Sequence, residues 1–314
     1  MNYAVIGGAG FIGSHVTRTI LNAGEHVTVF DNFSSGSEWH LSDVLDNPNL
    51  IIIRGDIKDL PVLQDALKGI ETVYHFASNP DISKAATHPD VDFWEGTCLT
   101  NNVLEAMRTN GVTRLIYASG SGVYGECGAL PVVENFPNMR PISTYGASKL
   151  ACEALICSYC FMFGLNAAAF RFANVVGPRQ THGIGFDFVN RLRSKPETLK
   201  ILGDGTQDKS YIYIDDIVAA IRLVETKYLN SYDVYNVATL DSITVTEIAD
   251  MACEITNSKN VAYEYTGGNR GWKGDVPIIY MNSEKIRKLG WSSKYTTKEA
   301  LYASMSAMYK EKRK

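Results

Sequence analysis

The stretch Gly7-Gly8-Ala9-Gly10-Phe11-Ile12-Gly13 follows a short apolar run, Tyr3 to Ile6, and precedes a segment with helical periodicity. Glycines here allow a tight turn, let the backbone approach a pyrophosphate, and let the next helix pack closely on a sheet. N–H groups at the start of that helix would hold the anion. The stretch therefore predicts a dinucleotide-binding turn, with Gly7, Gly10, Phe11, Ile12 and Gly13 against the cofactor.

The turn is the first of a series of strands and helices. The expected strands are Tyr3 to Ile6, His26 to Phe30, Leu50 to Arg54, Thr72 to Phe76, Arg114 to Ala118 and Asn166 to Arg171, and the expected helices lie near 12–23, 61–68, 92–109 and 145–163. This alternation predicts an α/β fold with a doubly wound parallel sheet.

After about Ala173 the rhythm breaks into segments marked by glycine and proline. The run Tyr211 to Glu225 and the strand Val234 to Val237 are expected to return to the sheet. We therefore expect an NAD-binding domain formed by 1–173 plus about 211–238. A smaller, discontinuous α/β substrate domain would comprise 174–210 and 239–314.

The choice of cofactor rests on Asp31, which closes the second strand. A carboxylate there can accept a hydrogen bond from the adenosine ribose 2′-hydroxyl and would repel a 2′-phosphate. The following segment, Asn32 to Gly36, has no arginine to hold such a phosphate, so the sequence favours NAD over NADP. The predicted cofactor contacts in this region are Asp31, Asn32, Ser35 and Gly36.

Two later strand ends add candidate cofactor contacts. Asp56 and Ile57 follow the third strand and would flank the adenine. Phe76, Ala77 and Ser78 follow the fourth and would line the pyrophosphate or the nicotinamide ribose. Each of these segments alone is equally compatible with ordinary loop chemistry.

The composition excludes several other classes of protein. The 314 residues include 30 basic and 34 acidic ones, a net charge of −4, and 45% are apolar, as in an ordinary globular protein. This balance gives no basic footprint for nucleic acid or an anionic membrane. We find no membrane-length apolar window and no signal peptide, so we expect a cytoplasmic protein with reduced cysteines. No metal is expected, since His75 and His182 lack ligand partners at useful spacing.

Tyr145 and Lys149 form the candidate catalytic pair. They lie four residues apart, on one face of the helix expected near 145–163. The Lys149 ammonium, with the positive nicotinamide ring, would stabilise a phenolate and make Tyr145 a general base. Ser119, at the end of the fifth strand, would complete a Ser-Tyr-Lys triad.

These motifs together resemble the extended short-chain dehydrogenase/reductase family, and within it the NAD-dependent nucleotide-sugar epimerases and dehydratases of the UDP-glucose 4-epimerase type. The resemblance covers essentially the whole chain. It rests on Gly7 to Gly13, Asp31-Asn32, Ser119 to Gly125, Tyr145 to Lys149, Arg171 to Asn174, Gly177-Pro178-Arg179, Leu202 to Gly205 with Gln207, and Tyr213 to Asp216.

The resemblance implies epimerisation of a nucleotide sugar, of the UDP-hexose class, at C4 through a transient 4-keto intermediate. Asn174 would contact the diphosphate, and Arg270 with Asp275 would clamp the nucleotide; Arg179 is a further expected substrate contact. Similar proteins pair the helices near 92–109 and 145–163 of two subunits, so a homodimer is expected. The alternatives are other 4-keto chemistry (UDP-glucuronate epimerisation, decarboxylation or dehydration) and a non-catalytic NAD-binding relative.

The chain departs from the family pattern at several positions. Gly120 stands where the family usually has its catalytic Ser or Thr, so we expect Ser119 to take that role, with Ser121 as the alternative and as a substrate contact. Dehydratases carry an acidic pair where this chain has Ser121 and Gly122, which argues against dehydration. In addition, Gly96 replaces an asparagine near the nicotinamide, and Lys209 replaces an arginine after Gln207.

Overall fold

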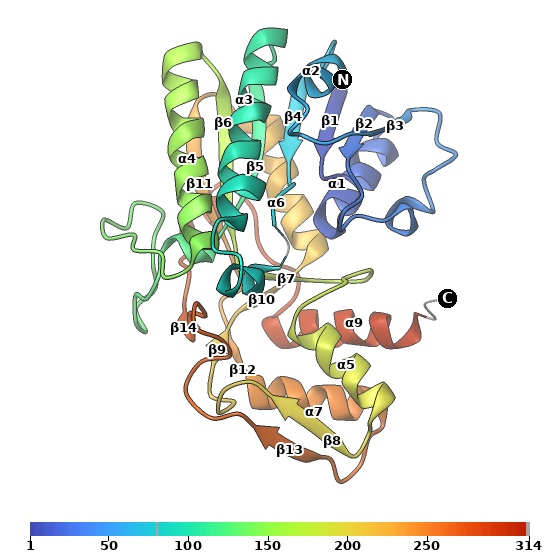
Figure 1. Ribbon diagram of the computed structural model, residues 1–314, viewed down its shortest axis with the longest axis vertical. Helices are drawn as coiled ribbons and strands as arrows, with labels where there is room; N and C mark the ends of the chain where they lie inside the picture. Colours follow the sequence, from blue (N-terminus) through green and yellow to red (C-terminus); the bar gives the residue numbers. More distant parts are fainter. Residues whose placement is uncertain (80, 312–314) are drawn as a thin grey trace. The chain divides into compact units, whose positions relative to one another are not determined.

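The computed structural model describes residues 1–79 and 81–311 (Figure 1). Contacts divide the chain into two compact units. The first unit comprises Met1–Val123, Ser143–Arg171 and Val218–Tyr235, and the second comprises Tyr124–Ile142, Phe172–Ile217 and the chain from Asn236 on. Segment 124–142 thus groups with the second unit, and the expected domain bounds stay a prediction.

A seven-stranded sheet organises the first unit. Its order is β11-β6-β5-β4-β1-β2-β3, and the pairs β1/β2, β2/β3, β1/β4 and β4/β5 are parallel. The strands are β1 (Asn2–Ile6), β2 (His26–Asp31), β3 (Leu50–Arg54), β4 (Thr72–His75), β5 (Arg114–Gly120), β6 (Asn166–Phe172) and β11 (Tyr232–Val237). This order confirms the doubly wound α/β fold and places its switch point between β1 and β4.

Helices connect these strands. They are α1 (Phe11–Asn22), α2 (Leu60–Ala66), α3 (Leu99–Asn110), α4 (Thr144–Phe163) and α6 (Ile214–Lys227). Three short 3-10 helices, η1 (Glu38–Leu41), η2 (Ile82–Ala86) and η4 (Ser121–Val123), and the π-helical η3 (Phe93–Cys98) lie in the connections. Helices α3 and α4 lie side by side (Figure 1). Leu104 of α3 and Ile156 of α4 are fully buried in one core with Leu115 of β5.

Helix α4 has a composition that the sequence analysis did not anticipate. The 20-residue helix is long and apolar enough to cross a membrane, with a mean hydropathy of 1.2. The expectation that the chain has no apolar window of membrane length is therefore wrong for this segment. However, its Lys149 and Glu153 are buried and bonded to residues of β5 and β6. These bonds identify α4 as a helix packed on the sheet; the cytoplasmic location stays a prediction.

The second unit contains small sheets and a helical layer. Its strands are β7 (Asn174–Val176), β8 (Thr198–Ile201), β9 (Asp208–Lys209), β10 (Tyr211–Tyr213), β12 (Ile243–Thr244), β13 (Ala262–Tyr265) and β14 (Ile278–Ile279), and its helices are α5 (Ile184–Ser194), α7 (Val245–Thr256), α8 (Glu284–Lys288) and α9 (Thr297–Lys310). Phe188 of α5, Ile248 of α7 and Leu301 of α9 are buried in one core.

The return of the chain to the large sheet is only partly as predicted. Residues Val234 to Val237 lie in β11, as expected. However, β10, which begins the run Tyr211 to Glu225, pairs in parallel with β7 and lies outside the seven-stranded sheet, whereas α6 supplies the rest of the run. The polar start of α6 is structural: the buried Asp216 carboxylate accepts hydrogen bonds from the backbone N–H groups of Lys294 (3.0 Å) and Tyr295 (3.4 Å).

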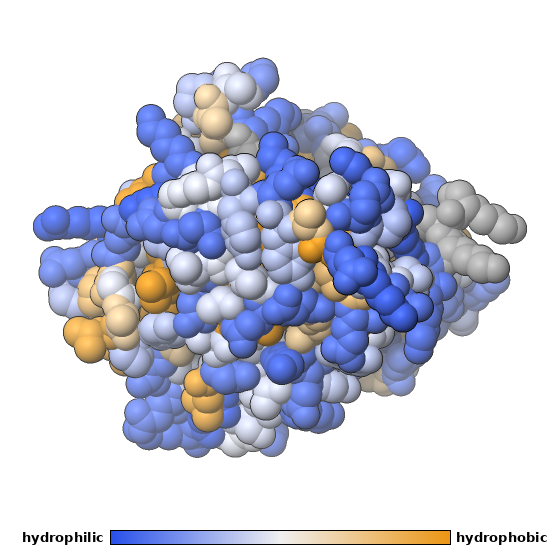
Figure 2. All heavy atoms as spheres, turned by 90° about the horizontal axis from the view of Figure 1, so that it is seen from below, coloured by the Kyte–Doolittle hydropathy of each residue, from blue (hydrophilic) through white to orange (hydrophobic). Residues whose placement is uncertain are grey.

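Hydrophilic side chains dominate the face shown in Figure 2, and hydrophobic side chains are scattered among them. Among the described residues, no group of three or more His, Cys, Asp or Glu side chains could hold a metal ion.

Candidate functional site

The glycine turn between β1 and α1 is packed too closely for side chains. Gly7 has φ +79°, and a Cβ there would lie 2.7 Å from the backbone nitrogen of Ala77, at the end of β4. A Cβ at Gly13 would overlap the carbonyl oxygen of Gly7. The first turn of α1 therefore sits directly on the strand end, with its N–H groups at the switch point.

Asp31 supports this turn from β2. Its carboxylate accepts hydrogen bonds from the backbone N–H groups of Ala9 (2.9 Å) and Phe33 (2.8 Å). Burial raises the pKa of Asp31, and these two hydrogen bonds oppose the shift. Gly36 approaches the same turn, since a Cβ there would lie 2.9 Å from the Cβ of Ala9. The structure thus brings Asp31 and Gly36 to the glycine turn.

The other predicted cofactor residues of this region surround the turn. Asn32 donates to the Asp56 carboxylate at 3.2 Å, and Ser35 is exposed. Ile57 is buried in the core and presents only its backbone, whose carbonyl accepts from Asn102 at 3.0 Å.

The remaining cofactor candidates lie at strand and helix ends. Phe11 and Ile12 open α1 and are half-buried. Phe76, Ala77 and Ser78 follow β4 and are half-buried as well. Ala77 and Phe76 lie closest to the glycine turn, since a Cβ at Gly7 would lie 2.7 Å from the nitrogen of Ala77 and 3.1 Å from the carbonyl carbon of Phe76.

Arg54 is a neighbour of this region that the sequence analysis missed. It is the register partner of Asp31 across β2 and β3, and its guanidinium lies 4.1 Å from the centre of the Phe33 ring. The segment Asn32 to Gly36 contains no cation, but parallel pairing brings one from the next strand. The signal was available, because Arg54 ends the predicted third strand just as Asp31 ends the second.

Tyr145 and Lys149 lie at the start of α4, where the Ser143 side chain caps the helix by accepting from the N–H of Gly146 at 3.1 Å. Lys149 is 4% exposed, donates to the carbonyl oxygen of Ala118 at 2.7 Å, and lies 5.5 Å from the centre of the Tyr145 ring. The Tyr145 hydroxyl makes no hydrogen bond to any described residue. A fixed ammonium beside a half-buried phenol is suited to proton transfer.

Ser119 is buried behind this pair. Its hydroxyl donates to the Glu153 carboxylate at 2.5 Å, and Glu153 in turn forms a buried ion pair with Arg171 at 2.6 Å. A serine hydroxyl has one proton to donate, and Ser119 donates it to Glu153 rather than to a substrate. The role of Ser119 as the assisting hydroxyl stays a prediction, and this hydrogen bond counts against it.

Ser121 is placed differently. It opens η4, is half-buried, and has no hydrogen-bond partner among the described residues. The next residue, Gly122, faces the start of α4, because a Cβ there would lie 3.5 Å from the Cα of Gly146. A Cβ at Gly120 would have no atom within 4 Å. Position 120 therefore has room for the side chain that the family usually carries.

Gly96, the other departure in this unit, lies in the π-helical η3. A Cβ there would overlap the Ser148 hydroxyl oxygen, which itself donates to the Asp92 carbonyl at 2.7 Å. A glycine at this position thus lets η3 approach α4 next to Lys149, and an asparagine would require Ser148 to move.

The predicted substrate residues Arg270 and Asp275 belong to the second unit and contact each other. Arg270 donates to the Asp275 carbonyl at 3.2 Å and forms an ion pair with Glu126. The Asp275 carboxylate pairs with Lys209 and accepts from the N–H of Gly271 at 3.1 Å. Lys209, which replaces the expected arginine, is therefore part of this charged cluster.

Asn174 and Arg179 lie elsewhere in the second unit. Asn174 is exposed at the start of β7, and its side-chain amide donates to the Ser210 carbonyl at 3.1 Å. Arg179 has φ +65°, and its backbone N–H donates to the Glu311 carboxylate at 3.3 Å. Neither is seen in contact with Arg270 or Asp275.

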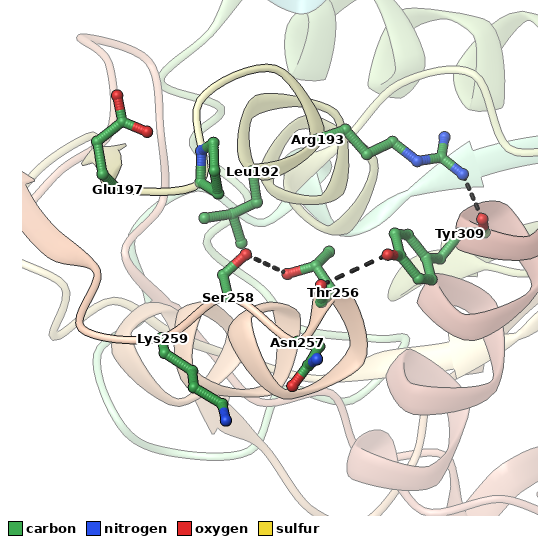
Figure 3. A pocket seen from close by; sticks show the side chains of 9 residues that line it. Leu192, Arg193, Glu197, Thr256, Asn257, Ser258, Lys259 and Tyr309 are labelled. Atoms are coloured by element: carbon green, nitrogen blue, oxygen red, sulfur yellow. Dashed lines mark hydrogen bonds between the residues drawn. The ribbon is translucent and has the colours of Figure 1, made fainter.

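A separate hollow of about 420 Å³ lies in the second unit (Figure 3). Its lining comprises Leu192, Arg193, Pro196, Glu197, Thr256, Asn257, Ser258, Lys259 and Tyr309. No predicted site residue lines it, and its polar groups bond to one another, as in the 2.9 Å contact between the Thr256 and Ser258 hydroxyls. It is therefore not the candidate active site.

Comparison with known proteins identifies the group to which these features belong. Residues 3–238 match the model of the NAD dependent epimerase/dehydratase family. The chain belongs to this family. It is 30% identical over 304 residues to a putative UDP-glucose 4-epimerase of Methanocaldococcus jannaschii, covering 95% of each chain.

Solved structures of family members extend the likeness. The UDP-glucose 4-epimerase of Thermotoga maritima, solved with UDP-glucose, has 31% identity and a TM-score of 0.88 over 98% of each chain. The UDP-glucose 4-epimerase of Thermus thermophilus, solved with NAD, has 29% identity and a TM-score of 0.87 over 98% of this chain and 99% of that one. This epimerase/dehydratase family member is accordingly an NAD-dependent enzyme of nucleotide-sugar chemistry.

The glycine turn fits NAD. Any side chain at Gly7 or Gly13 would collide with backbone, so the turn stays bare where a pyrophosphate must approach. Asp31 ends β2 with its carboxylate beside this turn, at the position that suits a ribose diol.

Asp31→Ser should change the cofactor preference. We expect NAD to bind roughly tenfold more weakly, because the loss of one charge-assisted hydrogen bond costs about 1.5 kcal/mol or more. NADP should bind more tightly, because the repelling carboxylate is gone and Arg54 remains nearby. Fluorescence titration with both cofactors measures this. The control is the double variant Asp31→Ser/Arg54→Gln, which should bind NADP no more tightly than the wild type. If the double variant bound NADP as tightly as Asp31→Ser, the role of Arg54 would be contradicted.

Proposed function

We propose that this enzyme inverts the configuration of a UDP-hexose at C4, interconverting UDP-glucose and UDP-galactose, with Tyr145 as the general base. The observation that carries the proposal is the Tyr145–Lys149 pair, in which a phenol hydroxyl that makes no hydrogen bond to a described residue lies near an ammonium fixed by the Ala118 carbonyl. The similarity to UDP-glucose 4-epimerases over nearly the whole chain supports the substrate class.

In this proposal the Tyr145 phenolate removes the proton of the sugar 4-hydroxyl, and Lys149 stabilises the phenolate before transfer. NAD held at the glycine turn and by Asp31 would supply the acceptor for the hydride that leaves C4 and the donor for its return. The 4-keto sugar then presents its other face, and Tyr145 gives the proton back to the oxygen at C4. The product has the same mass as the substrate, because nothing is lost or gained.

Ser121 is our preferred assisting hydroxyl, and Ser119 the alternative. The Ser121 hydroxyl has no hydrogen-bond partner in the described part of the chain and lies on the turn that packs against the start of α4, whereas the Ser119 proton is donated to Glu153. A donated hydrogen bond would stabilise negative charge on the oxygen at C4.

Residues of the second unit would hold the diphosphate. Arg270 offers a guanidinium suited to two parallel hydrogen bonds with phosphate oxygens, and Asp275 orients it through its carbonyl. The diphosphate would displace the Glu126 carboxylate from Arg270, exchanging one anion for another. Asn174 and Arg179 are proposed as further substrate contacts.

The reaction type is tested with a panel of UDP-glucose, UDP-galactose, their N-acetyl forms and UDP-glucuronate, analysed by NMR. One pair should interconvert at C4 without a change in mass. Loss of water or carbon dioxide would instead indicate dehydration or decarboxylation. Tyr145→Phe should lower kcat about 100- to 10,000-fold while NAD stays bound. NAD binding without turnover of any sugar would favour the non-catalytic alternative.

The roles of Ser119 and Ser121 can be distinguished with variants that remove the Ser121 hydroxyl and place a hydroxyl at position 120, where the family usually carries one. Ser121→Ala should lower kcat about 100-fold. Adding Gly120→Ser to that variant should restore most of the loss, because position 120 has free space for a side chain. Gly120→Ala in the same background is the matched control and should restore nothing. An unchanged kcat in Ser121→Ala would rule out this role for Ser121.

We also propose that two copies pair through α3 and α4. Exposed apolar side chains occur near both ends of α4: Phe93 and Trp94 of η3, which contacts the start of α4, are 53% and 51% exposed, and Phe161 and Met162 at its end are 94% and 68% exposed. Burial of such a surface would stabilise a homodimer. Light scattering should give twice the 34.6 kDa of one chain. Phe161→Glu should shift this to a monomer, whereas Leu240→Glu, at an 83% exposed site of the second unit, should not. A monomeric wild type would refute the proposal.

A further inference from the structure

A buried charged cluster behind the Tyr145–Lys149 pair is not used in the proposed chemistry. Glu153, on α4, accepts two hydrogen bonds from Arg171 of β6, from Nε at 3.0 Å and from Nη2 at 2.6 Å. It also accepts the hydroxyl of Ser119 on β5 at 2.5 Å. The side chains of Glu153 and Arg171 are only 4% and 3% exposed. One carboxylate thus joins a helix to two strands.

The cluster lies next to the contact that fixes Lys149. Glu153 follows Lys149 by one helical turn on the same face of α4. Ser119, held by Glu153, directly follows Ala118, whose carbonyl oxygen accepts from the Lys149 ammonium at 2.7 Å. The end of β5 is therefore tied to α4 at two consecutive residues, once through a side chain and once through a carbonyl.

We propose that Glu153 is a positioning residue, which, gripped by Arg171, holds Ser119 so that the Ala118 carbonyl keeps the Lys149 ammonium beside Tyr145. This inference rests on the proposed role of Tyr145 as the base. Without the hydrogen bond from Ser119, the end of β5 is held less firmly against α4. The ammonium then stabilises the phenolate less well, and Tyr145 ionises at higher pH.

Other titrating groups near Lys149 do not interfere. Its ammonium lies 5.0 Å from the centre of the Tyr117 ring on β5, and burial raises the pKa of Tyr117 well above its usual value. His75 of β4 packs against Tyr117, and burial, together with the charge of Lys149, lowers the pKa of His75 to about 3. Both groups therefore stay uncharged around neutral pH.

Further groups lie near the cluster and the start of α4. The buried Asp92 carboxylate accepts from the Thr144 hydroxyl at 2.6 Å. Cys152 of α4 donates its thiol to the Thr100 hydroxyl of α3 at 3.2 Å. Tyr232 of β11 feels the charges of Glu153 and Arg171, and burial raises its pKa far above the ordinary range. A titration that vanishes in Tyr145→Phe thus belongs to Tyr145.

The test measures the ionisation of Tyr145 in the full-length, NAD-bound protein without any nucleotide sugar. The readout is tyrosinate ultraviolet absorbance against pH, taken as the difference between each variant and the same variant carrying Tyr145→Phe. Ser119→Ala should move the midpoint up by about one pH unit, equivalent to 1.36 kcal/mol of lost phenolate stabilisation. Ser119→Thr keeps the hydroxyl and should restore the wild-type midpoint.

Glu153→Gln gives an outcome that separates positioning from simple electrostatics. Removing a negative charge and leaving the Arg171 cation would by itself move the Tyr145 midpoint down, whereas loss of positioning moves it up. Because this variant leaves a buried cation unpaired and can fail to fold, Ser119→Ala, which keeps the ion pair, is the primary test. Ser148→Ala is the matched control, since Ser148 is a buried α4 serine bonded to Asp92 and should leave the midpoint unchanged.

Kinetics give the second readout. With an active sugar, Ser119→Ala should lower kcat about tenfold at neutral pH, leave KM unchanged, and recover at high pH. An unchanged midpoint in Ser119→Ala would overturn the inference, and a pH-independent loss of kcat would make Ser119 a catalytic hydroxyl instead. Because the absorbance titration needs no sugar, an inactive substrate panel would refute the proposed reaction without deciding this test.

Discussion

The arrangement of the site depends on the ion pair and hydrogen bonds that the buried Glu153 carboxylate forms with Arg171 and Ser119. Removing two charges from water is costly, and the pair with Arg171 is favourable only because the guanidinium bonds through two nitrogens and Ser119 supplies a third donor. Loss of one partner of such a pair typically costs about 3–5 kcal/mol. The carboxylate thus fixes α4 against β5 and β6, one helical turn from Lys149, whose side chain reaches β5.

The cofactor end depends on a different constraint, the close approach of backbone to backbone. Gly7 and Gly13 leave no space for side chains where β1 turns into α1, and Asp31 ties that turn to β2 through the N–H of Ala9. Both ends of the site lie at the carboxyl ends of strands of one parallel sheet. The sheet therefore brings together side chains that are far apart in the sequence.

Much of this could be predicted from sequence. The six strands of the expected sheet are found within two residues of their predicted ends, because β-branched runs between helical segments give a strong local signal. The glycine turn and the Tyr145–Lys149 spacing are local signals too. In contrast, strands of two residues, such as β9 and β12, carry too few positions for any periodicity.

What the sequence could not show depends on contacts between distant residues. Ser119 was expected to face the substrate, but its partner, Glu153, comes from a helix on another part of the chain. The pairing of Arg270 with Glu126 likewise joins two loops that are far apart in the sequence. Such partners follow from tertiary packing, which local patterns do not encode.

The fate of the hydrogen at C4 tests the central claim most directly. UDP-glucose carrying deuterium at C4 is incubated with the NAD-bound enzyme in ordinary water, and the products are analysed by NMR and mass spectrometry. The account predicts a UDP-galactose product that keeps its deuterium at C4 and has an unchanged mass. Exchange of that deuterium with solvent, or a product lighter by water, would contradict epimerisation through a 4-keto sugar.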